Sequence, residues 1–315
     1  KELYVLPILI INQEIFGTIT MSPILKIIGE IIDNELSFKP INHSDFDKLS
    51  LKIISKLMIG KNDSISLKKL KNTLQYIQKD TNGTIFGLFN KFNSNLHDIS
   101  VYKEYIIKNY NRNNKNITKN FLKLSNNNDV YLLNEMPHWI IPMYGFMSFM
   151  IPILLEIILS FKFIYDKIII EINMPNFDIY SKTTYLHYVV IEHLRMFNII
   201  NMQTVRKIKQ DVKIDSFFFK KNSEAIILFS SLLRDKIFFK NPNYFNPNRW
   251  KEKSIKEQNI VFGVGEQMCP SINFTPLVYK NYIYYLLKKF KYKMKKNKYN
   301  INNLPHLINS FNLKF

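Results

Sequence analysis

The stretch Phe262-Gly-Val-Gly265-Glu-Gln-Met-Cys269-Pro-Ser-Ile-Asn-Phe274 decides the interpretation of this chain. It holds the only cysteine among 315 residues, between a loop with two glycines and an apolar segment that predicts a helix. Glycines let the backbone approach a large flat ligand closely, and a helix start favours a thiolate in front of it. Pro270 suits the first position of that helix. The stretch therefore predicts a thiolate able to hold an iron, with a small, inert, buried cysteine as the alternative.

Two further motifs lie upstream of the cysteine. Glu192-His-Leu-Arg195 falls on a largely apolar predicted helix, where residues three apart are neighbours and often form a surface salt bridge. Pro242-Asn-Tyr-Phe245-Asn-Pro247-Asn-Arg249-Trp250 follows at some distance. Because a charged pair on a buried helix must be satisfied by partners, Arg249 is predicted to join Glu192 and Arg195 as a third member.

In their order and spacing, the three motifs resemble those of the cytochrome P450 family. In that family a Glu-x-x-Arg pair meets the arginine of a Phe-x-Pro-x-Arg-Trp segment, and the haem-ligating cysteine follows in Phe-x-x-Gly-x-Arg-x-Cys-x-Gly. The resemblance runs from about residue 45 to the end and is specific over about 130–275. It implies a mainly α fold with small β-sheets (α+β), as a single domain over 1–315 that is incomplete at its amino-terminal end.

The resemblance also implies a cofactor, haem b, with Cys269 as the axial ligand of its iron. Phe262, Gly265 and Gln267 are the expected haem-binding residues of the loop, and Arg206, on predicted strands over 205–217, is expected to reach a propionate. Glu192, Arg195 and Arg249 are expected to form a structural triad that holds the loop and does no chemistry.

The loop departs from the family pattern at two positions. Gln267 stands where the family has an arginine, which removes a charged contact to a propionate but leaves an amide donor. Ser271 replaces the glycine after the cysteine and is expected to shift the start of the helix. No arginine of the family's C helix is recognisable either, so haem is expected to be held more weakly than usual.

Residues 136–161 predict a long apolar helix. No charged residue occurs from His138 to Leu155, which approaches the roughly 20 residues of a membrane span. A helix that is apolar on all sides is also what a large core buries, and the resemblance places the family's central helix here. We therefore expect a buried core helix.

On this helix, the resemblance makes Gly145 and Ser148 the catalytic candidates. Gly145 marks the place where the helix opens against the ligand, and Ser148 stands in for the threonine hydroxyl that steers protons. Met147 stands where an acid is usual, and a methionine relays no protons. A small packing residue is the alternative interpretation of Ser148.

Periodicity predicts the remaining elements. They are helices at 20–36, 45–59 (ending at Gly60) and 66–108 (broken near Asn82-Gly83), a loop at Asn109–Asn120, a short helix near Ser230, a helix at 276–288, and a strand from Lys289 with its lysines outward.

The composition limits the partners. A formal charge of +19 favours an acidic protein, an anionic membrane surface or nucleic acid. One cysteine excludes an internal disulfide and multi-cysteine metal sites, and it fits a reducing compartment. The six histidines form no metal-binding set. We expect an intracellular protein, cytoplasmic or peripherally membrane-associated (endoplasmic-reticulum-like) if an anchor precedes residue 1, and no nucleic-acid partner.

Three functions remain open at this point. The first is a monooxygenase that oxidises an apolar, lipid- or sterol-like molecule with electrons from a redox partner, either an NADPH-dependent reductase or a ferredoxin. The second is a peroxide-using or isomerase-like relative that needs no reductase, suggested by Met147. The third is a catalytically inactive basic binding protein on the same fold.

Overall fold

The computed structural model describes residues 21–36, 41–80, 104–110, 116–127, 129–197, 203–265, 268–292, 299–305, 308 and 314–315. The α-helices are α2 Met21–Glu35, α3 His43–Ile59, α4 Ser64–Asp80, α7 Ile117–Leu124, α8 Asp129–Gly145, α9 Ile151–Ser160, α10 Lys162–Ile172, α11 Tyr185–Met196, α12 Phe229–Leu232, α13 Ile255–Gln258 and α14 Phe274–Lys289. The strands are β1 Gln203–Lys207, β2 Val212–Ile214, β3 Phe217–Phe219 and β4 Glu224–Leu228.

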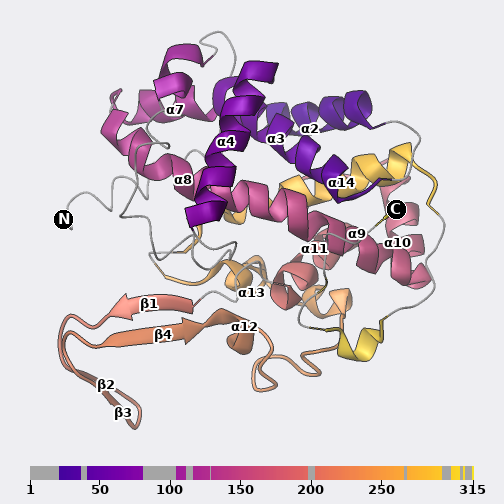
Figure 1. Cartoon of the computed structure of the whole chain (residues 1–315). Helices are drawn as coiled ribbons and strands as arrows, with labels where there is room; N and C mark the ends of the chain where they lie inside the picture. The colour runs from indigo at the N-terminus through magenta and orange to yellow at the C-terminus, as the bar shows by residue number, and fades with distance from the viewer. Residues whose placement is uncertain are drawn as a thin grey trace.

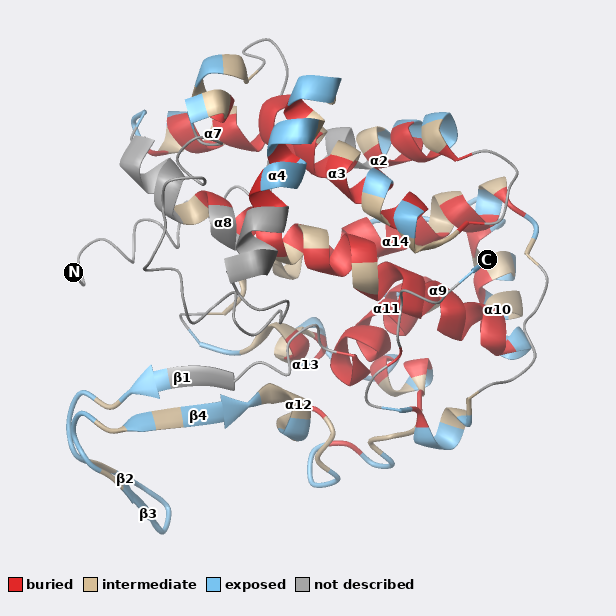
Figure 2. Cartoon of the chain, viewed as in Figure 1, coloured by how far each residue is buried: buried red, intermediate tan, exposed pale blue. Residues whose placement is uncertain are grey.

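The helices form one packed body, with the sheets at its side (Figure 1). Helix α14 packs against α2, α9 and α11, and α3 packs against α2, α4, α7 and α8. Helices α9, α11 and α14 are buried along most of their length, as Figure 2 shows. Apolar residues on nearly every side of these helices explain their central position.

The long apolar segment is a single helical run of α8, a π-helical turn at Phe146–Met150, and α9. The π-turn lies next to Pro152, whose nitrogen has no proton to donate to the preceding turn. The Ile151 N–H donates instead to the Phe146 carbonyl, five residues back. The stretch Trp139–Ser160 has a mean hydropathy of 1.8 and is long enough to cross a membrane, but 83% of its apolar window is buried inside the protein. The burial agrees with the expected core helix.

Two small antiparallel sheets follow α11. Strand β1 pairs with β4, with Arg206 opposite Ala225, and β2 pairs with β3, with Ile214 opposite Phe217. Together they make one long ribbon, because β2 and β3 lie between β1 and β4 in the chain. The alternation over 205–217 predicted strands here, and β1 and β2 cover six of those thirteen residues.

The helices predicted near the start of the chain are confirmed, with shifted bounds. Helix α3 ends where Gly60 adopts a left-handed conformation (φ 75°), which glycine accepts readily. At its start the Asn42 side chain and Asp45 form a capping box. Helix α4 ends at Asp80, and a further helical stretch covers 104–109. The predicted break near Asn82-Gly83 lies outside the described residues.

Three local predictions are wrong. Part of the predicted loop is helical, because the Asn116 side chain caps α7 by accepting the Lys119 N–H at 2.8 Å. The helix after the cysteine does not begin at Pro270: a short 3-10 turn comes first, and α14 begins at Phe274. Residues Phe290–Tyr292 form no strand, although Phe290 is buried and Lys291 exposed as expected. The residues that follow, 293–298, lie outside the described part of the chain.

Candidate functional site

The cysteine loop closes on itself through two backbone hydrogen bonds. The Cys269 N–H donates to the Phe262 carbonyl at 3.0 Å, and the Met268 N–H donates to the Gly265 carbonyl at 3.1 Å. Gly263 and Gly265 have φ values of +84° and +85°, in the left-handed region where a side chain causes strain. The two glycines therefore let the chain turn back, so that Cys269 lies beside Phe262.

The thiol of Cys269 is half-buried at the start of a short 3-10 turn, Pro270–Ile272. Its Sγ lies 3.1 Å from the Ser271 Oγ, and the Thr275 hydroxyl donates to the same oxygen at 3.0 Å. Ser271 has non-helical angles (φ −85°, ψ 16°), which separates the turn from α14. A serine after the cysteine thus coincides with the later helix start that the sequence suggested.

Open space beside the loop suits a flat ligand. A Cβ added at Gly265 would meet no atom within 4 Å, and one added at Gly263 would meet only the edge of the Phe229 ring, at 3.9 Å. A half-buried thiol, a glycine that leaves room and a neighbouring phenylalanine match the donor set and the shape that haem requires. The described residues therefore fit this cofactor.

The carboxylate of Glu192 lies at the centre of a buried network. Arg195 donates to both of its oxygens, each at 2.9 Å, and Arg249 Nε donates to Oε1 at 3.0 Å. Trp250 Nε1 and the Asn246 N–H donate to the same carboxylate, each at 2.9 Å. Glu192 and Arg195 are fully buried, so the ion pair depends on these partners for its stability. The structure brings together the three residues named as a triad.

A second set of hydrogen bonds connects this network with the cysteine loop. The Gln258 side chain donates to the Trp250 carbonyl at 3.3 Å and lies 3.1 Å from His187 Nε2 on α11. The 3-10 turn Asn259–Phe262 follows directly and leads into the loop. Burial lowers the pKa of His187 to about 3, and the nearby Lys280 ammonium is a smaller cause. The ring is therefore neutral, and its contact with Gln258 connects α11 to the segment before the loop without adding a charge.

Some of these contacts were not foreseen in the sequence. Gln258 sits in a polar stretch with no motif to mark it. Arg234, which follows the short helix predicted near Ser230, donates to the Met196 carbonyl at 2.9 Å and to the Leu304 carbonyl at 3.3 Å. It thereby ties the end of α11 to the carboxy-terminal segment. Trp250 was part of a recognised motif, but its indole donor became evident only in the structure.

Gly145 and Ser148 are both buried, at the end of α8 and in the π-turn. Ser148 Oγ has no hydrogen-bond partner among the described residues, and Met147 beside it is fully buried. The Phe146 ring stacks on Tyr279 of α14 at 5.7 Å between centroids. Helical residues two apart lie on nearly opposite sides, so Ser148 faces a different direction from Phe146. A role for Ser148 in proton transfer stays a prediction.

For two of the expected haem-binding residues the expected contact stays untested. Arg206 lies on β1 with an exposed side chain, and its contact with a propionate stays a prediction. Gln267 lies outside the described residues.

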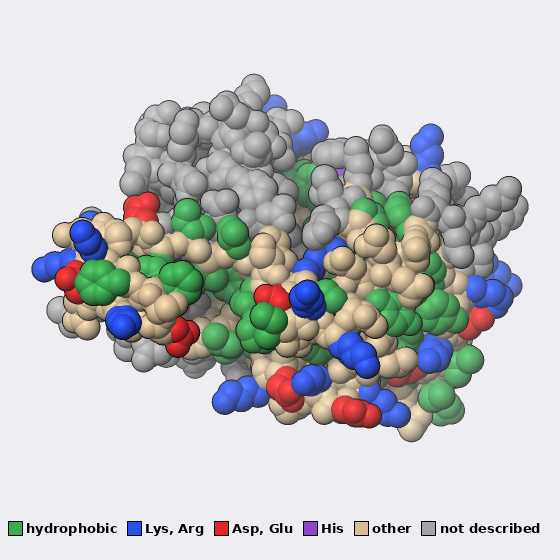
Figure 3. All heavy atoms as spheres, turned by 90° about the horizontal axis from the view of Figure 1, so that it is seen from below, with side chains coloured by type: hydrophobic (Ala, Val, Ile, Leu, Met, Phe, Trp, Pro, Cys, Tyr) green, Lys and Arg blue, Asp and Glu red, His purple; other side chains and the backbone are tan. Residues whose placement is uncertain are grey.

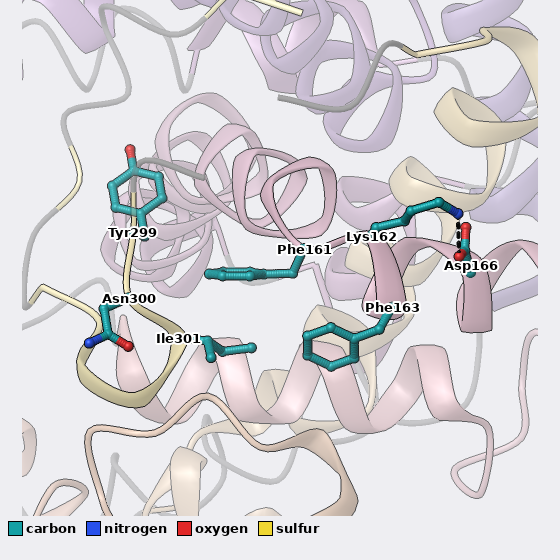
Figure 4. A pocket seen from close by; sticks show the side chains of 7 residues that line it. All are labelled: Phe161, Lys162, Phe163, Asp166, Tyr299, Asn300 and Ile301. Atoms are coloured by element: carbon teal, nitrogen blue, oxygen red, sulfur yellow. Dashed lines mark hydrogen bonds and ion pairs between the residues drawn. The ribbon is translucent and has the colours of Figure 1, made fainter. Parts of the chain in front are cut away.

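A pocket of about 590 Å³ lies elsewhere, where α9 meets α10 (Figure 4). Phe161, Phe163 and Ile301 supply apolar walls, and Lys162 pairs with Asp166 at its side. None of its lining residues belongs to the cysteine loop, so we do not assign it to the proposed site.

The burial of His193 makes stability depend on pH. Burial lowers its pKa to about 3, against about 6.5 in an unfolded chain. Between these values only the unfolded chain binds the proton, so the free energy of unfolding falls as the pH falls from about 6.5 towards 3. At pH 5 the loss from this residue is about 2 kcal/mol. Urea unfolding should show that His193→Phe, which keeps a ring beside Phe197, loses less stability than the wild type between pH 7 and pH 5. Parallel losses would contradict the assignment.

Comparison with known proteins gives a consistent family. Residues 165–312 match the family described as Cytochrome P450. Human cytochrome P450 2A6 is 32% identical over 108 residues, covering 33% of this chain and 22% of the relative. Beta-amyrin 11-oxidase of Glycyrrhiza uralensis is 28% identical over 126 residues, covering 40% and 25%. The alignments thus span about a fifth to a quarter of the length of these relatives.

A solved structure supports the fold over more of the chain. A crystal structure of P450BioI in complex with an acyl carrier protein ligated to hexadec-9Z-enoic acid superposes with a TM-score of 0.66. The superposition covers 89% of this chain and 71% of that one, at 17% identity. It confirms the predicted mainly α fold with small sheets. The family match includes Glu192, Arg249 and Cys269, whereas Gly145 and Ser148 lie before it.

Proposed function

Because the chain belongs to the cytochrome P450 family, we propose that it is a haem-thiolate monooxygenase that inserts one oxygen atom of O₂ into an apolar organic substrate. The observation that carries the proposal is Cys269 itself. Its half-buried thiol lies at the end of a glycine loop, before α14. The segment that leads into this loop is held at Gln258, which donates to the carbonyl of Trp250, a partner of Glu192. We regard the 315 residues as belonging to one domain of this kind.

In this proposal, the thiolate of Cys269 would hold haem b through its iron, and Phe262, Gly265, Gln267 and Arg206 would be further binding residues. A haem with a thiolate ligand supplies activation of O₂, because the sulfur donates electron density to the iron. The protein residues orient and protect that centre. Glu192, Arg195 and Arg249 hold the loop rigid, and the buried helices exclude water.

The substrate and the electron donor are proposed from chemistry and from the relatives. A lipid- or sterol-like molecule suits an apolar interior. One similar protein is a beta-amyrin 11-oxidase, and the similar solved structure is a complex with an acyl carrier protein ligated to hexadec-9Z-enoic acid. Electrons would come from a separate reductase or ferredoxin, whose acidic docking face would suit the charge of +19. Such a donor and substrate fit an intracellular protein in contact with a membrane surface.

The buried Met147 favours a second candidate, a relative that uses peroxide instead of a reductase, because the residue before Ser148 is this methionine, which passes no protons, and not an acid. With NADPH and a reductase, Ser148→Ala is expected to lower product formed per O₂ consumed by at least about tenfold, the low end of what positioned proton transfer contributes. With peroxide as oxidant the same variant should keep its product yield. Product analysis with an apolar test substrate measures both yields.

Ser160→Ala is the matched control for this experiment. Ser160 is also a buried serine of the same helical run, and its Oγ likewise has no hydrogen-bond partner among the described residues. It should change neither yield. A wild-type protein that forms product with peroxide but consumes no O₂ with a reductase would establish the second candidate.

A further inference from the structure

The hydroxyl of Ser271 lies next to the sulfur that the proposed function makes a haem ligand. Its Oγ is 3.1 Å from the Cys269 Sγ, and both residues are half-buried around the turn Pro270–Ile272. A glycine, which the family pattern has at this position, would offer no side-chain group to the sulfur. The contact is therefore a feature of this chain's own sequence.

Two observations give the contact a direction. The Thr275 hydroxyl donates to the Ser271 Oγ at 3.0 Å, so this oxygen already accepts one hydrogen bond and keeps its own proton for another acceptor. A sulfur that ligates a metal is a thiolate, which has no proton to donate. Once Cys269 is a thiolate, the hydrogen bond therefore runs from the Ser271 hydroxyl to the sulfur.

The local fold fixes the positions of these groups. Thr275 is buried in the first turn of α14, whereas Ser271 keeps non-helical angles, with its oxygen within hydrogen-bond distance of both Thr275 and Cys269. Pro270, directly after the cysteine, has no N–H to offer the sulfur. Among the described residues, the Ser271 hydroxyl is the donor that the structure shows at this sulfur.

A donor at the sulfur favours the reduced form of a bound haem. Reduction adds one electron from the donor protein and no proton, so the negative charge shared by the iron and its thiolate ligand grows. A hydrogen bond to an acceptor becomes stronger as the acceptor becomes more negative. Hydrogen bonds to the ligand atoms are also among the features by which a protein tunes a metal centre. The Ser271 hydroxyl is thus expected to stabilise the reduced state more than the oxidised state.

We propose that Ser271, oriented by Thr275, donates a hydrogen bond to the Cys269 thiolate and thereby raises the reduction potential of the haem that this thiolate holds. Both are positioning residues, since they act through the sulfur. The inference rests on the proposed function, because it concerns the same thiolate. It adds that this chain accepts an electron from weaker reductants than it would with a glycine at position 271.

The surface of the protein makes this property relevant to the choice of electron donor. Seen from below, the described Lys and Arg side chains are spread among acidic and hydrophobic ones and are not gathered in one patch (Figure 3). Charge on this face therefore favours acidic partners in general and selects no single docking position. A higher potential increases the driving force from every one-electron donor, whether a reductase or a ferredoxin.

A redox titration of the haem-loaded 315-residue chain, followed by its absorption spectrum, tests the proposal. At a fixed potential, Ser271→Ala should lower the ratio of reduced to oxidised protein about tenfold, which corresponds to a potential lower by about 59 mV for one electron. Ser271→Thr keeps the hydroxyl and should stay close to the wild type. The iron–sulfur stretching frequency in the resonance Raman spectrum should rise in Ser271→Ala and stay unchanged in Ser271→Thr.

The role of Thr275 is tested by a double-mutant cycle. Thr275→Val removes the donor that orients the Ser271 hydroxyl and should lower the potential by part of the Ser271→Ala effect. In the Ser271→Ala background the same change should have no further effect, because Thr275 acts through Ser271. Thr118→Val is the matched control, since Thr118 is also a buried threonine, on α7, and it should leave the potential unchanged.

The spectrum with carbon monoxide separates this inference from the proposed function. A red-shifted band in both the wild type and Ser271→Ala shows that the thiolate still holds the haem, and equal potentials would then overturn this inference alone. So would a potential that falls equally in Ser271→Thr, or a Thr275→Val effect that adds in full to that of Ser271→Ala. A wild-type chain that binds no haem would overturn both.

Discussion

Replacing Cys269 with alanine is expected to abolish the strongly red-shifted Soret band of the reduced, carbon-monoxide-treated protein. The band requires a thiolate ligand on the haem iron, and Cys269 is the only cysteine in the chain. No other residue can therefore supply a thiolate. The measurement is an absorption spectrum of the purified protein with haem supplied, before and after reduction and addition of carbon monoxide.

Ser271→Ala is the matched control for the cysteine variant. It removes the hydroxyl that lies 3.1 Å from the sulfur and leaves the sulfur in place, so the red-shifted band should remain. A wild-type chain that binds no haem would count against the enzyme and favour an inactive binding protein on the same fold. A red-shifted band that persists in Cys269→Ala would show that the ligand has been assigned wrongly.

The second large effect is expected at Glu192. Glu192→Gln keeps the shape of the side chain but removes the negative charge that Arg195 and Arg249 share. It also places an amide donor among groups that all donate. Removing one partner of a buried ion pair typically costs about 3–5 kcal/mol, because the remaining charge stays buried without compensation. Since a domain of this kind is stable by only about 5–15 kcal/mol, the loss is a large part of the total.

Urea unfolding measures this loss as a lower midpoint at an unchanged slope. Asp166→Asn is the matched control, since it makes the same carboxylate-to-amide change in the exposed pair with Lys162 and should cost less than about 1 kcal/mol. Glu192→Gln should also weaken haem retention on gel filtration, because Trp250 and Gln258 transmit its position to the loop. Equal midpoints for the two variants would mean that the triad adds little to the fold.

Several parts of the molecule could be predicted from local patterns alone. Apolar spacing predicted α2, α3 and the long central helix, and alternation predicted β1 and β2. The order of the Glu192, Arg249 and Cys269 motifs predicted the family, because a motif lists residue types at short spacing. The helix start at Pro270 was predicted wrongly, although the serine at position 271 had indicated a shifted start. The turn angles of Ser271 decide that start, and a residue pattern does not report them.

Other features depended on contacts between distant segments. The π-turn at Phe146–Met150 was not predicted, although Pro152, whose nitrogen has no proton to donate, is part of its cause. The partners of Glu192 come from residues more than fifty positions away, and the role of Gln258 follows only from its place between α11 and the loop. Asn116 lies in a polar, loop-like stretch, and only the structure shows its side chain capping α7.

The sequence by itself determined most of the long helices, the candidate ligand and the family, because spacing along the chain directly sets which residues share a helix face or a short loop. Only the tertiary structure decided which charges are buried together, which glycine leaves open space, and which apolar residues stay outside the core. The Phe217-Phe218-Phe219 run illustrates the difference. Its composition is that of a core strand. None of the described helices packs closely on β2 or β3, however, and two of the three rings are exposed. Burial depends on what packs against a segment, and a segment's own sequence does not contain that information.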